Sequence, residues 1–356
     1  MSGATLGSVE YTGSGTITKL AGVMDPLVAP GWTTPGGETV EITAELTAWA
    51  TANGIDEAAF ASDKAGDNGL TAYQSYALGV NVGEDVEVKY AATATAMTFT
   101  TQKAANLSDA VSYTLYKDGA AIDGTSVDTT SGDFSGVYQL QAKVTDGDGI
   151  KVVETDKIGV RVVADTAAAG TYYLSVPFTA IGSDEGVAPT AIVENARLAE
   201  DDQILVYGEN GWEAYLYDGS KWEFVESELV TKPTVTKLAR GSAVKLVKAA
   251  GSYPVYTVGG YSEAAVATSV AKGANLIGNP TGAAFTPNAA TLGTTMTDLV
   301  RDPSDGASFQ YYNGAWKKFS QTVVNGRLKT TYSDATAIGA GKAFFFTTSS
   351  PKSINW

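Results

Sequence analysis

The side chains that point most directly to binding chemistry are aromatic. They lie in two short segments of the second half of the chain, at Trp212, Tyr215, Tyr217, Trp222, Tyr311, Tyr312 and Trp316. Flat rings stack on the faces of sugars, so these residues could form a carbohydrate-binding platform. Large aromatic side chains also fill protein cores, and neighbouring residues of a strand face opposite ways. The sequence therefore leaves both interpretations open, with some rings exposed and others buried.

One short acidic segment could bind a cation. Residues 146–149 (DGDG) place Asp146 and Asp148 two residues apart, and calcium takes carboxylate and carbonyl oxygens as ligands. Asp and Gly are also the ordinary residues of a β-turn, and no acidic residue follows at the twelfth position of an EF-hand loop. Calcium at Asp146 and Asp148 is therefore one hypothesis and a plain turn is the other. We expect no other cofactor.

Side chains for catalysis are largely missing from the sequence. The chain has no histidine and no cysteine, which removes the Ser-His-Asp triad, thiolate nucleophiles, disulfides and cysteine-ligated zinc sites. Glycoside hydrolysis would need a carboxylate pair, and acidic residues near the first aromatic segment are Glu209, Glu213, Asp218, Glu223 and Glu226. The second segment has Lys317 and Lys318 near the position of Glu223, so such a pair is not repeated. We expect a protein that is not an enzyme.

The charge balance and the hydropathy pattern limit the partners. The chain has 24 basic and 39 acidic residues, a net charge of −15. Nucleic-acid binding needs clustered Lys and Arg to neutralise phosphates, so we expect no nucleic-acid partner. The sequence has no run of 18 apolar residues, so we expect no membrane insertion.

The aromatic segments belong to a repeat that fills residues 171–356. Each copy has an opening segment, an aromatic hairpin and a glycine-led strand in the same order. In the first copy these are residues 173–178 (YLSVPF), 215–224 (YLYDGSKWEF) and 240–246 (RGSAVKL). In the second copy they are residues 275–280 (NLIGNP), 309–319 (FQYYNGAWKKF) and 340–346 (AGKAFFF). We expect two small antiparallel sheets that pack with pseudo-twofold symmetry around one shared core.

The turn residues of the two aromatic segments also predict β-hairpins. Asp218-Gly219 and Asn313-Gly314 are dipeptides typical of tight hairpin turns, and aromatic residues flank both.

The second copy, from its NLIGNP segment to its GKAFF segment, resembles a recurrent "NLxGNP … GxAFF" module found near the C-terminus of secreted bacterial surface proteins. Ala274 stands where that module usually has Trp. The resemblance implies an extracellular β module with an architectural or sorting-related role and no chemistry of its own.

The segment before the repeat reads as an immunoglobulin-like sandwich over residues 84–165. Short runs rich in β-branched and aromatic residues alternate there with Gly/Asp turns. Residues 136–147 (GVYQLQAKVTDG) resemble the tyrosine-corner strand of bacterial immunoglobulin-like and polycystic-kidney-type domains. Residues 166–170 (TAAAG) are typical of a linker.

The N-terminal part carries the helical pattern. Ile42, Leu46 and Trp49 share one helix face, and Asn53-Gly54 predicts where that helix ends. Further short helices are expected near Asp56 and from residue 71. Residues 1–35 read as one or two strands with little core material. They are either an edge strand of a later domain or a strand donated to a neighbouring subunit.

Together these patterns predict a mainly β protein with a small helical insert near residues 40–79. The expected segments are residues 1–35, 36–83, 84–165, 171–262 and 263–356. We expect a self-assembling structural subunit of a surface filament or surface layer, whose partners are copies of itself. A carbohydrate-binding or adhesive protein, with cell-surface glycans as partners, is the alternative. The composition is rich in Gly, Ala, Thr, Val, Ser, Asp and Tyr and is similar to that of bacterial surface-layer and filament subunits. From this composition we expect an extracellular or cell-surface protein. Because the chain's start lacks signal-peptide features, we expect that the signal peptide has been removed; a cytoplasmic protein is the other possibility.

Overall fold

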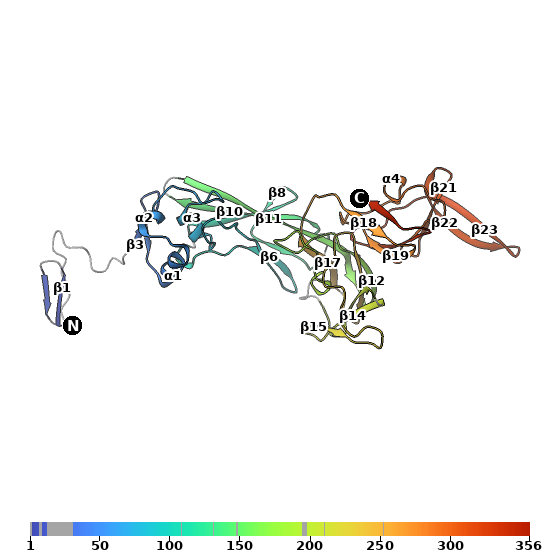
Figure 1. Ribbon diagram of the computed structural model, residues 1–356, viewed down its shortest axis with the longest axis horizontal. Coiled ribbons are helices and arrows are strands. Elements are labelled where there is room, and N and C mark those ends of the chain that lie inside the picture. The colour runs from blue at the N-terminus through green and yellow to red at the C-terminus, as the bar shows by residue number, and fades with distance from the viewer. Residues whose placement is uncertain are drawn as a thin grey trace. The chain divides into compact units, whose positions relative to one another are not determined.

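The computed structural model describes residues 2–6, 9–12, 31–107, 109–130, 132–146, 149–193, 198–209, 211–251 and 253–356, without the side chains of residues 2–6, 9–12, 146 and 166. The fold is mainly β, with 46% of residues in strands and 10% in helices, which confirms the predicted fold class. The chain divides into two compact units, one made of residues 1–86, 102–112 and 143–153 and the other of the remaining residues (Figure 1).

The first unit contains most of the helices. They are α1 (Ala44–Asn53), α2 (Glu57–Phe60), α3 (Ala72–Ala77) and the 3-10 helix η1 (Ala105–Leu107). Its short strands form two antiparallel pairs, β1 (Ser2–Leu6) with β2 (Val9–Thr12) and β3 (Gly31–Thr33) with β4 (Thr39–Glu41). The proposed donation of a strand from residues 1–35 falls largely outside the described residues.

Local capping signals set the helix ends. Gly54 takes the left-handed conformation (φ 66°) that ends α1, and Asp56 caps the start of α2. Thr71 forms a capping box with Gln74 at the start of α3. Ile42 lies before α1 instead of on it, because the side chain of Thr43 accepts the N-cap hydrogen bond from Leu46.

A β-sandwich follows, and most of its residues belong to the second unit. One sheet has the order β17-β11-β10-β7-β8 and the other the order β5-β6-β9. The strands are β5 (Lys89–Ala92), β6 (Ala96–Thr100), β7 (Val111–Lys117), β8 (Ala120–Ile122), β9 (Ser126–Asp128), β10 (Gly136–Asp146), β11 (Gly149–Ala167) and β17 (Tyr253–Gly260). Inside, Tyr138 is fully buried and its hydroxyl donates to the Phe134 carbonyl at 2.6 Å, the geometry of a tyrosine corner.

The sandwich takes one strand from far along the chain. β17 pairs with β11 from Ile158↔Gly260 to Ala167↔Tyr253. Tyr256 and Val258 of β17 lie in the same hydrophobic core as Tyr138. The range 84–165 expected for the sandwich omits this strand, because pairing between such distant segments leaves no local sequence signal.

The repeat forms two similar sheets in the second unit, one in residues 170–248, which we call the first module, and one in residues 267–355, which we call the second module. The first has the order β12-β16-β13-β14-β15 and the second the order β19-β24-β20-β21-β22-β23. The strands of the first sheet are β12 (Gly170–Ser175), β13 (Gln203–Gly208), β14 (Gly211–Tyr217), β15 (Trp222–Val225) and β16 (Ala243–Lys248). Those of the second are β19 (Gly273–Gly278), β20 (Leu299–Arg301), β21 (Ser308–Tyr312), β22 (Ala315–Val324), β23 (Arg327–Asp334) and β24 (Ala343–Thr348).

The shared strand order makes five strands of each sheet equivalent: β12 and β19, β16 and β24, β13 and β20, β14 and β21, β15 and β22. The register agrees, with Ser175↔Ala243 in the first sheet and Gly278↔Ala343 in the second. A further antiparallel pair, β18 (Ala267–Val270) with β25 (Lys352–Asn355), belongs to the second module and corresponds to the end of β11 with β17. Two short helices, η2 (Pro189–Ala191) and α4 (Ala289–Leu292), follow the first strand of each sheet.

The two modules contact each other through equivalent backbone groups. The Ser175 N–H donates to the Gly341 carbonyl at 2.8 Å, and the Gly278 N–H donates to the Gly241 carbonyl at 2.9 Å. This exchange gives the contact pseudo-twofold symmetry. Each module nevertheless has its own hydrophobic core, so the prediction of one shared core is wrong. The strands approach too closely for one: a Cβ on Gly278 would lie 2.5 Å from the Ser175 Cβ.

Candidate functional site

The structure separates the seven predicted aromatic residues by exposure. Tyr215, Tyr217 and Trp316 are buried, and Trp222 and Tyr311 are partly buried. The exposed rings are Trp212, which lies edge-on to Tyr207 at 5.4 Å, and Tyr312, which stacks on Tyr332 at 4.0 Å. The seven residues therefore do not form one surface.

Two of the aromatic pairs occupy equivalent positions. Tyr217 contacts Trp222 at a centroid distance of 5.3 Å in the first module, and Tyr311 contacts Trp316 at 6.4 Å in the second. Each pair joins residues directly opposite in the β14–β15 and β21–β22 hairpins. The two tryptophans are thus a natural comparison within one chain.

The hairpin turns differ although their dipeptides look alike. Asn313 and Gly314 both have positive φ (49° and 84°) and form a two-residue turn between Tyr312 and Ala315, as predicted. Asp218-Gly219 lies in a four-residue loop instead, so the tight turn predicted there is wrong. The Asp218 carboxylate accepts hydrogen bonds from the backbone N–H groups of Lys221 and Ser220, both at 2.8 Å. These bonds lower the pKa of Asp218.

An open groove of about 710 Å³ lies over the hairpin of the first module. Its lining includes three aromatic residues, Tyr215, Trp222 and Phe224, together with Val193 and Thr190. The rings of Tyr215 and Phe224 meet edge-on at 5.6 Å. We call this site the aromatic groove. It brings together two of the predicted aromatic residues.

The second module has no such exposure at the equivalent tryptophan. Trp316 is only 4% exposed, and its indole N–H donates to the Gly293 carbonyl, just after α4, at 2.9 Å. Lys318 stands at the register position that Phe224 occupies in the first module. The same tryptophan position is therefore core in one module and part of a groove wall in the other.

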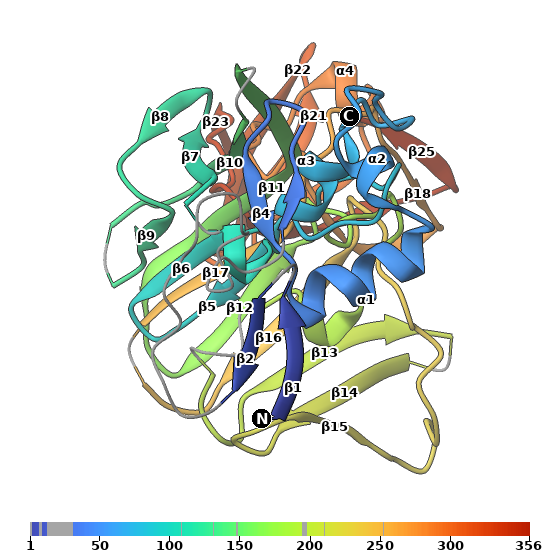
Figure 2. The same cartoon turned by 90° about the vertical axis from the view of Figure 1, so that its left-hand side faces the viewer.

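The sheet of the first module ends at β15. In the second module the equivalent strand β22 continues and pairs with β23, for example at Lys317↔Asp334 and Phe319↔Tyr332. One edge of β15 pairs with β14, beside which it lies in Figure 2. Among the described residues no strand pairs with the opposite, outer edge of β15. Val225 on this strand is 43% exposed. The first module therefore presents a sheet edge at the position that the second fills with its own strand.

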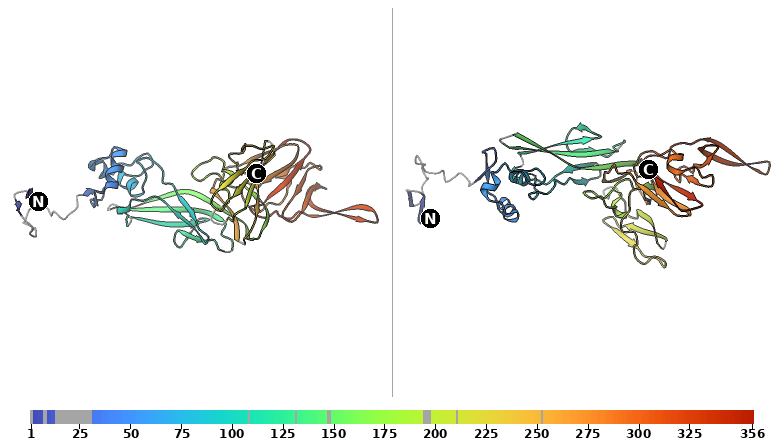
Figure 3. Two further views of the ribbon diagram at one scale, coloured as in Figure 1. Left: turned by 90° about the horizontal axis from the view of Figure 1, so that it is seen from below. Right: turned by 45° about the horizontal axis from the view of Figure 1, so that its top comes forward.

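The β22–β23 hairpin extends far beyond its sheet (Figures 1 and 3). We call residues 320–331 of this hairpin the arm. Nearly all of its side chains are exposed on both faces. At its tip Val323 and Leu328 lie directly opposite each other and are 72% and 64% exposed. An isolated two-stranded ribbon is only marginally stable in water, so the arm is a candidate contact surface.

The hairpin that carries the arm is basic in an acidic chain. Residues 315–334 contain Lys317, Lys318, Arg327 and Lys329 against a single acidic residue, Asp334, whereas the whole chain has 39 acidic and 24 basic residues. This hairpin was not predicted from the sequence. Its signal was Asn325-Gly326, whose residues have φ 50° and 75° and form the turn.

The buried carboxylates hold loops in place. Glu213, 1% exposed, accepts hydrogen bonds from the N–H groups of Thr234 (2.9 Å) and Val235 (3.1 Å). Asp202 accepts from the Tyr253 hydroxyl at 2.8 Å, and its counterpart Asp298 pairs with the Lys352 ammonium. These contacts give each of the three carboxylates a structural partner.

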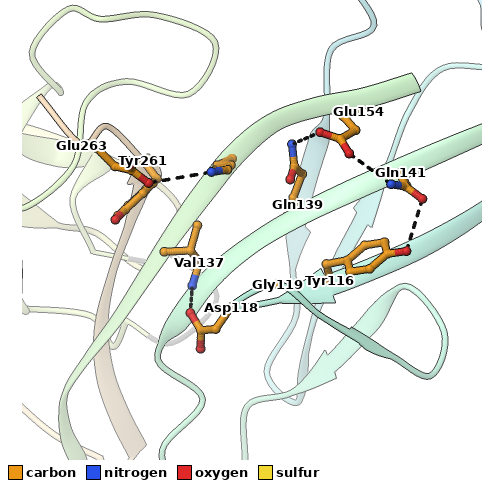
Figure 4. A pocket seen from close by; sticks show the side chains of 10 residues that line it. Tyr116, Asp118, Gly119, Val137, Gln139, Gln141, Glu154, Tyr261 and Glu263 are labelled. Carbon is orange, nitrogen blue, oxygen red and sulfur yellow. Dashed lines mark hydrogen bonds and ion pairs between the residues drawn. The ribbon is translucent and has the colours of Figure 1, made fainter. Parts of the chain in front are cut away.

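A second groove, of about 420 Å³, lies on the outer face of the sandwich sheet (Figure 4). The amide N–H groups of Gln139 and Gln141 point to the Glu154 carboxylate, with Gln141 at 3.2 Å, and the Tyr116 hydroxyl donates to Gln141 at 3.3 Å. Asp118 accepts from the backbone N–H of Val137 at 2.8 Å. The polar groups of this groove mainly bond one another across strands.

The proposed calcium ligands fall outside the described part of the chain: Asp148 entirely, and Asp146 in its side chain. Among the described side chains, no group of three or more His, Cys, Asp or Glu residues is placed to hold a metal ion. Within the same residues, the helices are all too short or too polar to span a membrane.

Comparison with known proteins adds no assignment. No protein-family model matches the sequence, and no curated protein matches it. The features that bear on function are the aromatic groove, the outer edge of β15 and the arm.

Proposed function

We propose that this protein is a non-enzymatic structural subunit that self-assembles into an extracellular filament or surface layer. The observation that carries the proposal is the arm, a two-stranded ribbon exposed on both faces with an apolar pair at its tip. When a partner covers such a surface, apolar side chains leave water and the complex is stabilised. Burying a Val or Leu side chain contributes about 1.5 to 3 kcal/mol.

Charge supports a partner of the same kind as the chain itself. The hairpin is basic, while the chain as a whole has a net charge of −15. A second copy therefore offers the arm an acidic surface, and opposite charges steer and align such encounters. A nucleic acid would be attracted to the basic hairpin but repelled by the acidic rest of the chain.

The side-chain chemistry supports a role without catalysis. The chain has no histidine and no cysteine. Glu213, Asp202 and Asp298 are buried and serve in hydrogen bonds or an ion pair between segments. The extracellular placement rests on the composition and on the resemblance of residues 275–346 to modules of secreted surface proteins.

Negative-stain electron microscopy of the full chain tests the proposal. We expect ordered filaments or sheets from the wild type and their loss in the Val323→Ser/Leu328→Ser variant. The matched control is Ile150→Ser/Met296→Ser, which removes similarly exposed apolar side chains elsewhere. Monodisperse monomers of the wild type at all concentrations, or equal assembly by the arm variant, would contradict the proposal.

A second function, carbohydrate binding, is proposed from the aromatic groove, where Tyr215, Trp222 and Phe224 line one open site. A glycan array with the wild type and Trp222→Ala tests it. Binding that the variant loses while remaining folded is the expected result. An absence of any bound sugar on folded wild-type protein would remove this candidate.

A further inference from the structure

We infer that the outer edge of β15 in one copy accepts β23 of a second copy as an added antiparallel strand. The inference rests on the self-assembly proposed above and names the surface that receives the arm. It follows from comparing the two modules, which differ at this one sheet position.

The second module shows which kind of element can cover the outer edge of β15. There β22 takes the place of β15 and is covered by β23, so its sheet has a sixth strand. The first module stops at the fifth. Exposed sheet edges are templates for pairing with another chain, and adding a strand to an edge is a common mode of recognition.

The charges of the two edges are complementary. Glu223 of β15 occupies the register position of Lys317, which in the second module pairs with Asp334 at 2.7 Å. The sign is thus reversed in the first module, and an incoming strand needs a basic residue there. β23 offers Arg327 and Lys329. Glu223 already forms an ion pair with Lys221, but both side chains are exposed. Exposed ion pairs of this kind add little to the stability of the fold.

One register satisfies both charge and burial. With Lys329 opposite Glu223, antiparallel pairing puts Leu328 opposite Phe224 and Arg327 opposite Val225. Directly opposite residues share a face of the sheet. Leu328, the exposed apolar residue of the arm tip, then lies on the face of β15 where Phe224 lines the aromatic groove.

The same charges disfavour the wrong pairings. If the β23 edges of two copies paired, the basic side chains of Arg327 and Lys329 would lie close together and repel each other. If two β15 edges paired, the two Glu223 carboxylates would repel each other in the same way. Specific pairing of this sort uses repulsion as well as attraction. Because donor and acceptor edges differ, each copy can use both, and such a head-to-tail contact forms open chains unless it closes into a ring.

Cysteine cross-linking tests the register directly, because the chain has no cysteine of its own. Val225→Cys and Arg327→Cys are made as separate variants, mixed and oxidised. Residues directly opposite lie within the Cα separation that a disulfide spans. We expect a disulfide-linked dimer from the mixture, and far less from Val225→Cys mixed with Ile150→Cys. Equal cross-linking in both mixtures would overturn the inference.

A charge swap separates this inference from self-assembly itself. Glu223→Lys and Lys329→Glu should each raise the concentration needed for assembly by about tenfold or more. The double variant should restore assembly toward the wild type. If the wild type assembles but the swap has no effect and the cross-link fails, the acceptor edge is wrong and self-assembly stands. If the wild type never assembles, both proposals fail.

Discussion

The equivalent tryptophans allow a matched test of which aromatic residues are core. Trp316 is 4% exposed in the core of the second module and its indole N–H is bonded to Gly293. Removing a large buried aromatic side chain costs about 3 to 5 kcal/mol, because it leaves a cavity. Trp222 is partly buried beside an open groove, so Trp222→Ala should cost about 1 to 2 kcal/mol, since less apolar surface returns to water.

Hydrogen exchange followed by mass spectrometry can read the two modules separately within one chain. The peptide covering β24 (Ala343–Thr348) reports on the second module, and the peptide covering β16 (Ala243–Lys248) reports on the first. Slow-exchanging core strands give the opening free energy of their own region. We expect Trp316→Ala to lower the opening free energy of β24. This loss should be at least twice the loss that Trp222→Ala causes in the opening free energy of β16. Equal losses, or a larger loss from Trp222→Ala, would refute the assignment of Trp316 to the core and Trp222 to a groove wall.

Three further changes test the fold. Tyr138→Phe removes a buried hydroxyl that donates at 2.6 Å, and thermal denaturation should show a loss of about 1 to 2 kcal/mol; no change would contradict the corner geometry. Gly278→Ala places a Cβ 2.5 Å from that of Ser175, so limited proteolysis should cut between the modules faster than in the Ala274→Ser control. The pKa of Asp218 is lowered in the fold, so its stabilisation is present above the ordinary carboxyl pKa and lost as the pH falls through the lower folded value. The melting-temperature gap between wild type and Asp218→Asn should therefore be largest near pH 7 and narrow below about pH 4; a constant gap would contradict this linkage.

Features set by neighbouring residues were predictable from the sequence. The ends of the helices follow from Gly54, Asp56 and Thr71, whose side chains or backbone act within one helical turn. Asn313-Gly314 makes its turn alone, because both residues accept positive φ. At Asp218 the carboxylate instead bonds two N–H groups further along and lengthens the loop. That choice depends on side-chain geometry that the dipeptide does not reveal.

Features set by distant residues were not predictable. Whether a tryptophan is buried depends on the loop that covers it, as Gly293 covers Trp316. The pairing of β17 with β11 joins segments about a hundred residues apart, and no local pattern marks it. The separate cores of the modules follow from the close approach at Gly278, where small residues leave no room for side chains. The arm was also missed, although Asn325-Gly326 at its turn is a local sequence signal for a hairpin.

Self-assembly through the arm is tested most directly by sedimentation velocity of the wild type and of a chain with a shortened arm. Ser320 and Thr331 are cross-strand partners four residues along each strand from Val324 and Arg327, which flank the natural turn, so replacing residues 321–330 by Asn-Gly closes the hairpin with the same two-residue turn and leaves the rest of the sheet in place. We expect the wild type to sediment as species whose size grows with protein concentration, and the shortened chain to remain a folded monomer at every concentration. Identical sedimentation of the two chains would contradict it.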